Sequence, residues 1–528
     1  MPSKFDKIKI FGENLSIEEV TAVARDMVVA ELSQDPEVRQ KIVASRRFLE
    51  ETIARGDIIY GVNTGFGGNV RFLLPHDELA QHQEDIFKFL VCGTGPPLPE
   101  EIVRAAILLR ANALAKGYSA VRLPIIEKLV ELLNHRISPV VPRYGSVGAS
   151  GDLIPSAYIG QVLLGKGEVF YNGQRVSAQE ALRRAQLQPV TLEVKEGLAL
   201  VNGTTVMTGI GALVLDDGAQ LARLVPACCM LTLEAVRGTE DPLHENVQKV
   251  KNHPGQIAVA DICRKFLEGS RYVRNLHEMR VRMAQRPETG PGITYAEEAI
   301  QTSYSLRCVP QGLGPVWDGL REHRLCIERE INSANDNPLV DPHNGQVYHT
   351  GNFYGGHVAR ALDSWKIDLV TMGNWLHSLM AMIVDDRFNN GLPPNLVRNP
   401  GRSSGFKGMQ LCLTSLVCAL RHLAGPNMIH SLTTEQYNQD MVSLGFHSAL
   451  TAMEMTELLR DATAIMLITV CQAIDLRGGK TSLGAGNRDV YEAIRSRITF
   501  LDQDRALDSD IAAVRDMIKQ KTIQLPQP

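Results

Sequence analysis

The sequence lacks the features that mark membrane and secreted proteins. No apolar run approaches the roughly 20 residues that a membrane-spanning helix needs. The first residues, Met1 to Lys7, are polar and lack the apolar core of a signal peptide. These absences predict a cytoplasmic protein that has no membrane partner.

Strong net charge and paired cysteine motifs are also missing. The formal net charge is -4 over 528 residues, which gives no electrostatic argument for a nucleic-acid partner. The nine cysteines are odd in number and form no CxxC motif. Because most of them lie in apolar segments, we expect buried thiols, with no disulfide scaffold and no metal site.

Apolar residues recur at helical spacing over most of the chain, whereas strand signals are few. Many later helices are apolar around much of their circumference, which indicates burial on several sides. We therefore expect a mainly α protein with a loop-rich N-terminal domain (1–205), a central helical bundle (206–480) and peripheral helices (481–528). The expected bundle helices after residue 290 are 295–306, 311–333, 353–383, 408–424 and 439–475.

Short segments interrupt this helical pattern. Residues 58–60 are expected to form a strand that enters a glycine-dense loop, and Tyr60 lies at its end. Asn172-Gly173 predicts the turn of a small hairpin over residues 167–177. Residues 196–204 are expected to be a glycine-punctuated loop before a long apolar helix.

A small, nearly uncharged loop contains Ala149-Ser150-Gly151. Gly151 has no side chain, so its nitrogen could attack the carbonyl of Ala149, and Ser150 has a hydroxyl that can leave as water. Loss of two waters would leave a methylidene-imidazolone ring, which is an electrophile. Asp152 is expected to cap a helix that starts at Leu153. Taken alone, the tripeptide is common and equally describes an ordinary loop.

Four polar clusters at helix ends contain amides, hydroxyls and one arginine, which are groups that bind a carboxylate. They cover residues 301–311, 331–338, 349–355 and 434–440. Each cluster also has a purely structural explanation. Arg307 could form an ion pair, residues 335–338 could end a helix, and Glu435 with Gln439 could cap the last long helix.

Several motifs occur in one order along the chain. They are Tyr60-Gly-Val-Asn-Thr-Gly-Phe-Gly, Gly148-Ala-Ser-Gly-Asp-Leu, Leu200-Val-Asn-Gly-Thr, Tyr304-Ser-Leu-Arg, Asn335-Asp-Asn-Pro and Asn438-Gln-Asp. Together they resemble the aromatic amino acid ammonia-lyases and the related aminomutases, over about residues 10 to 500. Phe89-Leu90, Gly405-Phe-Lys-Gly and the segment from Arg143 to Pro155 look like those of bacterial phenylalanine ammonia-lyases, as does Glu435-Gln-Tyr-Asn-Gln-Asp. The resemblance implies the ammonia-lyase/fumarase-like helical fold and a homotetramer with shared active sites.

The resemblance also implies roles for individual residues. Ala149, Ser150 and Gly151 would cyclise into 4-methylidene-imidazole-5-one (MIO), a cofactor that needs neither metal nor nucleotide. Tyr60 would remove the β-proton of the substrate, with its pKa well below the ordinary value of about 10. The substrate-binding residues would be Phe89, Leu90, Asn202, Gln301, Tyr304, Arg307, Asn337, Phe353, Lys407, Glu435, Asn438 and Gln439, with Asn335 as a further candidate.

The implied reaction is elimination of ammonia from L-phenylalanine to give trans-cinnamate. Phe89 cannot pair with a ring hydroxyl, and burying one unpaired costs roughly 1–3 kcal/mol, which favours phenylalanine over tyrosine. Phe89 and Leu90 could instead be ordinary core residues. The remaining alternatives are a phenylalanine or tyrosine 2,3-aminomutase and a tyrosine or histidine ammonia-lyase.

Overall fold

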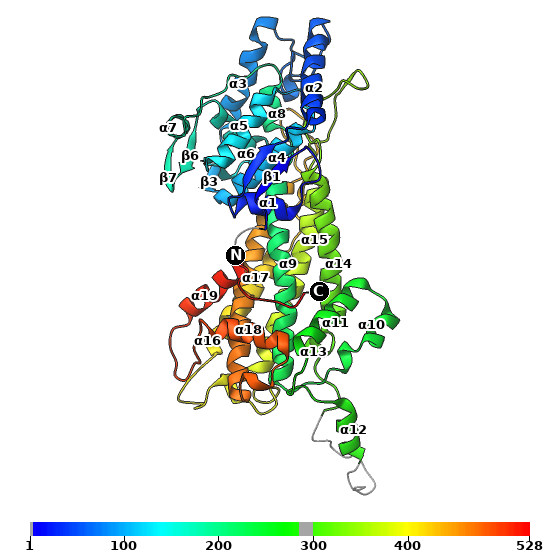
Figure 1. Cartoon of the computed structure of the whole chain (residues 1–528), viewed down its shortest axis with the longest axis vertical. Coiled ribbons are helices and arrows are strands. Elements are labelled where there is room, and N and C mark those ends of the chain that lie inside the picture. Colours follow the sequence, from blue (N-terminus) through cyan, green and yellow to red (C-terminus); the bar gives the residue numbers. More distant parts are fainter. Residues whose placement is uncertain (1–3, 285–298, 528) are drawn as a thin grey trace. The chain divides into compact units, whose positions relative to one another are not determined.

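The computed structural model describes residues 4–284 and 299–527. Helices dominate these ranges, and the described strands form small sheets of two or three strands (Figure 1). The predicted mainly α fold is therefore confirmed. No helix in the described ranges is long and apolar enough to cross a membrane. The cytoplasmic location stays a prediction.

The chain forms two compact units, each assembled from three stretches of sequence. The first unit comprises Met1–Asp216, Glu322–Ser364 and Pro426–Met453, and the second comprises Asp217–Arg321, Trp365–Gly425 and Glu454–Pro528. Four long helices pass from one unit into the other, namely α9 (Thr205–Ala235), α14 (Val309–Ile331), α15 (Gly356–Ile383) and α17 (Gly445–Arg477). The expected division at residues 205 and 480 stays a prediction.

The first unit is organised around α4 (Glu100–Ala115), in which every residue from Ile102 onwards is buried. Helices α1 and α5 pack against it. The other helices of this unit are α1 (Ile17–Ala24), α2 (Pro36–Ala54), α3 (Leu79–Leu90), α5 (Leu123–Asn134), α6 (Leu153–Leu163), α7 (Ala178–Arg184) and α8 (Glu196–Val201).

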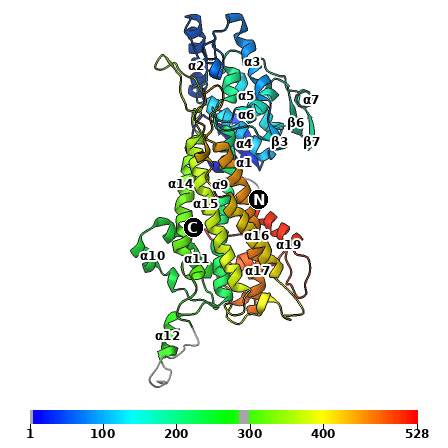
Figure 2. The same cartoon turned by 180° about the vertical axis from the view of Figure 1, so that it is seen from behind.

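The strands of the described chain lie in the first unit. They are β1 (Lys7–Ile10), β2 (Val29–Leu32), β3 (Thr94–Pro97), β4 (Ser138–Pro139), β5 (Pro142–Tyr144), β6 (Glu168–Tyr171), β7 (Gln174–Ser177), β8 (Leu339–Asp341) and β9 (Gln346–Tyr348). Strands β6 and β7 form the predicted antiparallel hairpin beside α7 (Figure 2). Asn172 and Gly173 both have positive φ there, as the predicted turn requires.

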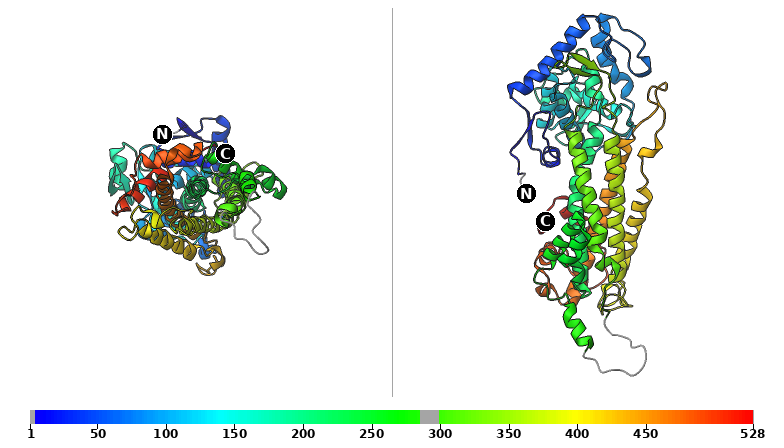
Figure 3. Two further views of the ribbon diagram at one scale, coloured as in Figure 1. Left: turned by 90° about the horizontal axis from the view of Figure 1, so that it is seen from below. Right: turned by 90° about the vertical axis from the view of Figure 1, so that its right-hand side faces the viewer.

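The second unit contains the remaining parts of the long helices, which run side by side (Figure 3). Arg460 on α17 pairs with Asp217 on α9 at 2.7 Å in its interior, where both side chains are buried. Its shorter helices are α10 (Glu245–Lys251), α11 (Pro254–Leu267), α12 (Leu276–Ala284), α13 (Tyr304–Arg307), α16 (Lys407–Leu423), α18 (Ala485–Arg495) and α19 (Asp508–Lys519).

Two expected elements next to the candidate site are wrong. Residues 58–60 form no strand, and residues 196–201, expected to be part of a loop, form α8. Gly197 lies inside α8, where no larger residue fits, because a Cβ there would sit 2.1 Å from the backbone oxygen of Gln83. This glycine permits close packing of α8 on α3 and does not mark a loop.

Two bundle helices also have different bounds from those expected. Helix 295–306 is wrong over 299–303, which is not helical, and residues 295–298 lie outside the described ranges. Helix α17 begins at Gly445 and not at residue 439. Leu444 has φ +52, and Gln439 pairs with Thr434 in an isolated bridge, so the backbone before Gly445 is not helical.

Candidate active site

The backbone around Ser150 and Gly151 is left-handed, with φ values of +57 and +76. Gly203 holds it in place, because its N–H donates to the oxygen of Ser150 at 3.1 Å. Its oxygen accepts from the N–H of Asp152 at 2.7 Å. A Cβ on Gly151 would lie 2.0 Å from that same oxygen, so only glycine fits here.

The N-termini of three helices meet at this loop. Helix α6 follows Asp152 directly, and α9 begins two residues after Gly203. Helix α17 begins just after Val442 and Leu444, on which Ala149 packs. The positive ends of the three helix dipoles therefore lie near the loop, where they favour negative charge on a ligand or intermediate.

Asp152 occupies the expected N-cap position of α6, but its side chain makes no capping bond to that helix. Its carboxylate accepts instead from the N–H of Met207 at 2.7 Å, in the first turn of α9, and from the hydroxyl of Ser146 at 3.1 Å. Burial raises the pKa of Asp152 to about 7, although these hydrogen bonds oppose the shift. The residue therefore ties the loop to α9.

Tyr60 lies on the glycine-dense loop and accepts a hydrogen bond from the N–H of Gly67 at 2.8 Å. Glu435 binds the adjacent N–H of Gly68, at 2.8 and 3.1 Å. Burial raises the pKa of Tyr60 above its ordinary value; the N–H of Gly67 opposes this shift and the charge of Glu435 adds to it. The expectation of a lowered pKa for Tyr60 is therefore wrong when only the groups of the first unit surround it.

Two cavities of the first unit contain most of the predicted site residues. The larger, of about 740 Å³, is lined by Tyr60, Phe89, Leu90, Ala149, Ser150, Gly151, Asn202, Glu435 and Gln439. The smaller, of about 550 Å³, is lined by Tyr60, Ser150, Asn337, Phe353 and Asn438. Leu90 is buried, but 57% of the Phe89 surface is exposed, so Phe89 is not an ordinary core residue.

The four other predicted residues belong to the second unit. Gln301 and Arg307 line a cavity of about 420 Å³ there, and Arg307 lies over the ring of Tyr304 at 4.6 Å. Lys407 is the first residue of α16. The Nε atom of Arg307 donates to the backbone oxygen of Thr302 at 3.3 Å, and no ion pair of Arg307 with a carboxylate occurs among the described residues. The ring of Tyr304 is 71% exposed.

His82 and Phe66 also line the larger cavity, although the sequence interpretation did not select them. Their rings stack with centroids 4.1 Å apart and planes 9° from parallel. His82 lies seven residues before Phe89 in α3, and this two-turn spacing places both on one face of the helix. Its Nε2 atom is buried without a hydrogen-bond partner, and burial lowers its pKa.

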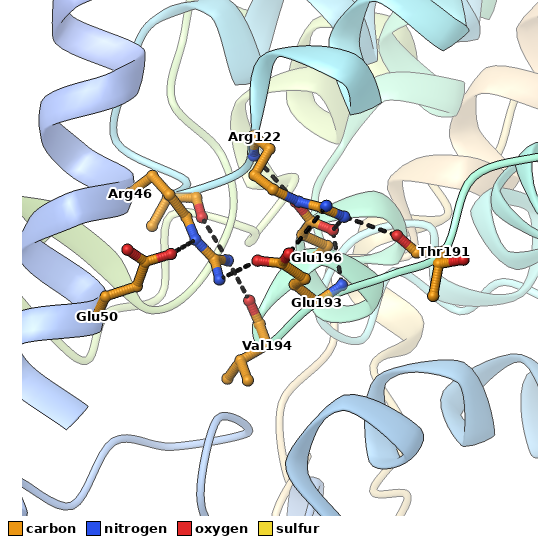
Figure 4. A network of polar contacts seen from close by, with 8 residues as sticks. Arg46, Glu50, Arg122, Thr191, Glu193, Val194 and Glu196 are labelled. Carbon is orange, nitrogen blue, oxygen red and sulfur yellow. Dashed lines mark hydrogen bonds and ion pairs between the residues drawn. The ribbon is translucent and has the colours of Figure 1, made fainter. Parts of the chain in front are cut away.

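A polar network fixes α8, which leads to Asn202 (Figure 4). Arg122 binds the buried carboxylate of Glu196 through Nε at 2.8 Å and Nη2 at 2.7 Å. Arg46 binds Glu193 and the backbone oxygen of Val194. The network secures the N-terminal end of α8, so the position of Asn202 at its other end is well defined.

The residues present fit the implied imidazolone ring. Asn202 is 2% exposed and lines the larger cavity, yet its Oδ1 atom has no hydrogen-bond partner. A buried amide oxygen of this kind needs a donor, which the amine of a substrate bound at the ring would supply. Within the described ranges, no group of three or more His, Cys, Asp or Glu side chains is placed to hold a metal ion.

Known proteins resemble the chain over nearly its whole length. The model of the aromatic amino acid lyase family matches residues 15–496. A histidine ammonia-lyase of Caldanaerobacter subterraneus is 39% identical, with 98% of this chain and 97% of that protein covered. The structure of a tyrosine aminomutase from Streptomyces globisporus superposes with a TM-score of 0.94, at 33% identity and with 98% and 97% of the two chains covered.

A phenylalanine aminomutase of Pantoea agglomerans superposes with a TM-score of 0.93, at 33% identity and with 97% and 99% of the chains covered. These relatives act on different aromatic amino acids according to their names, so they leave the substrate open. Sequence and fold agree, however, on the family. The chain belongs to the aromatic amino acid lyases.

Proposed function

We propose that this protein is a phenylalanine ammonia-lyase that releases ammonia and trans-cinnamate from L-phenylalanine. The observation that carries the proposal is the larger cavity, which holds Tyr60 and the Ala149–Gly151 loop beside an apolar wall. Phe89 and Leu90 form part of that wall. A phenyl ring suits it better than an imidazole, whose nitrogens would need hydrogen-bond partners.

The chain's own residues would divide the chemistry between them. Cyclised Ala149-Ser150-Gly151 would supply an electrophile for the amine of the substrate. Asn202 would accept a hydrogen bond from that amine through its unpartnered Oδ1 atom. Tyr60 would take the β-proton, and the N–H of Gly67 would stabilise the phenolate.

The raised pKa of Tyr60 implies that a further positive charge completes the site. We propose that the protein is a homotetramer in which Gln301, Tyr304 and Arg307 of one subunit join Tyr60 of another. Arg307 would bind the carboxylate of the substrate together with Asn337, and its charge would lower the pKa of Tyr60. The exposed ring of Tyr304 supports this arrangement, as does Arg307, whose hydrogen bond among the described residues goes to a backbone oxygen and not to a carboxylate.

A 2,3-aminomutase is the second candidate, because two solved structures that match nearly the whole chain are described as aminomutases. An aminomutase would use the same residues but return ammonia to the β-carbon. Histidine ammonia-lyase activity also has support, from the relative of that name and from the unpartnered nitrogen of His82 in the cavity.

One experiment separates these functions. The purified protein is incubated with phenylalanine, tyrosine and histidine separately, and the products are resolved by chromatography for arylacrylates and β-amino acids. We expect cinnamate from phenylalanine with the highest kcat/KM of the three. Exclusive formation of β-phenylalanine would identify a mutase, and preferred turnover of histidine would refute the assignment of the substrate.

A further inference from the structure

Arg110 is a buried arginine of α4 that has no role in the chemistry described above. Its Nη1 atom donates to the backbone oxygen of Asn202 at 2.7 Å and to that of Ala199 at 3.3 Å. Its Nη2 atom donates to the hydroxyl of Thr205 at 3.2 Å. One guanidinium thus holds the end of α8 and the start of α9 together. We call residues 202–205 the α8–α9 turn.

This turn also contacts the loop that contains Ala149-Ser150-Gly151, which we call the cofactor loop. Gly203 exchanges backbone hydrogen bonds with Ser150 and Asp152. The preceding residue, Asn202, faces the larger cavity with its side chain. Arg110 therefore binds the backbone of Asn202, whose side chain would face the substrate. The next residue, Gly203, is the one that pairs with the loop.

The charge of Arg110 is expensive to bury, which argues that its geometry matters. Burial lowers its pKa to about 10, so it stays a cation at neutral pH. The buried carboxylates of Asp336 and Asp152 act on it electrostatically and oppose this shift. Its direct partners are two carbonyl oxygens and one hydroxyl oxygen, which belong to Ala199, Asn202 and Thr205. A planar fork with several donors can reach them together, whereas a single ammonium group cannot.

We propose that Arg110 is a positioning residue that holds the α8–α9 turn in register with Ala149-Ser150-Gly151, so that the loop can cyclise and Asn202 faces the substrate amine. The inference rests on the proposed function, since it concerns the formation of the implied cofactor. It predicts that loss of Arg110 impairs cyclisation as well as turnover.

The same helix offers a matched control in Arg104, which is equally buried. Its guanidinium donates to the backbone oxygens of Val23, Ala24 and Leu133, none of which lines either cavity of the first unit. Burial lowers its pKa to about 10 as well. Replacing either arginine therefore removes a similar buried charge, but only Arg110 contacts the α8–α9 turn.

The experiment compares Arg110→Gln, Arg110→Lys, Arg104→Gln and Arg104→Lys with the wild type. Intact mass reports cyclisation, because the ring forms with the loss of two waters. Thermal unfolding reports stability, and kcat and KM are measured on phenylalanine. We expect both glutamine variants to lose stability, but only Arg110→Gln to retain its two waters in part of the molecules.

Among the Arg110→Gln molecules that do cyclise, we expect kcat to fall on the order of a hundredfold with a smaller change in KM, because a misplaced Asn202 spoils the geometry of attack. Arg110→Lys should give intermediate values for both cyclisation and kcat, and it serves as the deciding variant if Arg110→Gln does not fold.

Two results would overturn the proposal while leaving the lyase assignment intact. One is complete loss of both waters by the Arg110 variants, together with wild-type kcat. The other is an equal defect in the Arg104 variants, which would indicate a general effect of stability. If the wild type itself keeps both waters, the proposed cofactor is wrong and this inference falls with it.

Discussion

Ser150 and Gly151 are the residues whose backbone would take part in the proposed cyclisation. Both have positive φ, a conformation that a serine adopts only where its surroundings impose it. The pairing with Gly203 supplies that constraint. Whether the loop cyclises can therefore be tested separately from whether the protein folds.

Ser150→Ala removes only the hydroxyl that would leave as water. We expect the wild type to weigh two waters less than its sequence and the variant to lose at most the one water of ring closure, because its residue 150 has no hydroxyl to eliminate. The variant should produce no cinnamate but unfold within a few degrees of the wild type, because the backbone bonds to Gly203 are unaffected. Intact-mass spectrometry and thermal unfolding check this. An active wild-type preparation with the unmodified mass would contradict the cofactor assignment.

His82→Phe tests the contribution of a polar atom on an apolar wall. The new ring can keep the stack on Phe66 but lacks the unpartnered Nε2 atom. We expect the ratio of kcat/KM for tyrosine or histidine to kcat/KM for phenylalanine to fall. The fall should correspond to roughly 1–3 kcal/mol in transition-state binding, the typical cost of leaving one buried polar group without its hydrogen bond. Steady-state kinetics on the three substrates measure this. An unchanged ratio would mean that His82 does not contact the ring of the substrate.

At the scale of elements, the site depends on how α3, α8 and α9 meet the cofactor loop. Apolar spacing was enough to predict most helices, because the helical recurrence of apolar residues is a local pattern that a single sequence displays. It was not enough for α8, because a glycine such as Gly197 is typical of a loop. Its packing role becomes visible only from the backbone oxygen of Gln83, which lies too close for a side chain. The same holds for Asp152, which does not cap α6 as expected but accepts from the N–H of Met207, 55 residues away. Local patterns predict local partners, and these two contacts are not local.

Asp152 should give the protein a pH-dependent stability. Its pKa in the folded state is about 7, whereas an unfolded aspartate titrates near about 3.9. Between these values the folded state binds more protons. The stabilising contribution is therefore complete below about pH 4 and is lost as the pH rises through about 7. We expect Asp152→Asn to flatten this decline, which amounts to about 4 kcal/mol at most.

Urea unfolding of the wild type and the variant at several pH values measures the effect. Asp385→Asn is a suitable control, because the pKa of Asp385 is about 2 and the group stays ionised throughout this range. Its stability profile should run parallel to that of the wild type. A parallel profile for Asp152→Asn would instead show that Asp152 is charged in the folded protein at neutral pH.

At the scale of the whole molecule, the predicted site residues fall into both compact units. Tyr60, the cofactor loop and Asn202 share a cavity in the first unit, whereas Arg307 and Gln301 share one in the second. The order of motifs in the sequence indicated all of these residues. It could not indicate which of them line the same cavity, because that depends on contacts between residues far apart in the sequence.

Mixing two inactive variants tests the shared site. We expect Tyr60→Phe and Arg307→Gln to be inactive alone, and to regain part of the activity when they are co-expressed, because some sites would then combine an intact Tyr60 with an intact Arg307. Turnover of phenylalanine by the purified mixed oligomer, with its mass from light scattering, provides the measurement. No regain of activity in a mixed tetramer would place each site within one chain.

The contact between Gly203 and the cofactor loop has a consequence for biosynthesis. Residues 151 and 203 lie far apart in the sequence and pair in the folded structure, so under the proposed function we expect a nascent or misfolded chain not to acquire the electrophile. Cellular thiols and amines would otherwise attack such a group. If the ring forms as proposed, folding would precede reactivity, and only a folded chain would carry the electrophile.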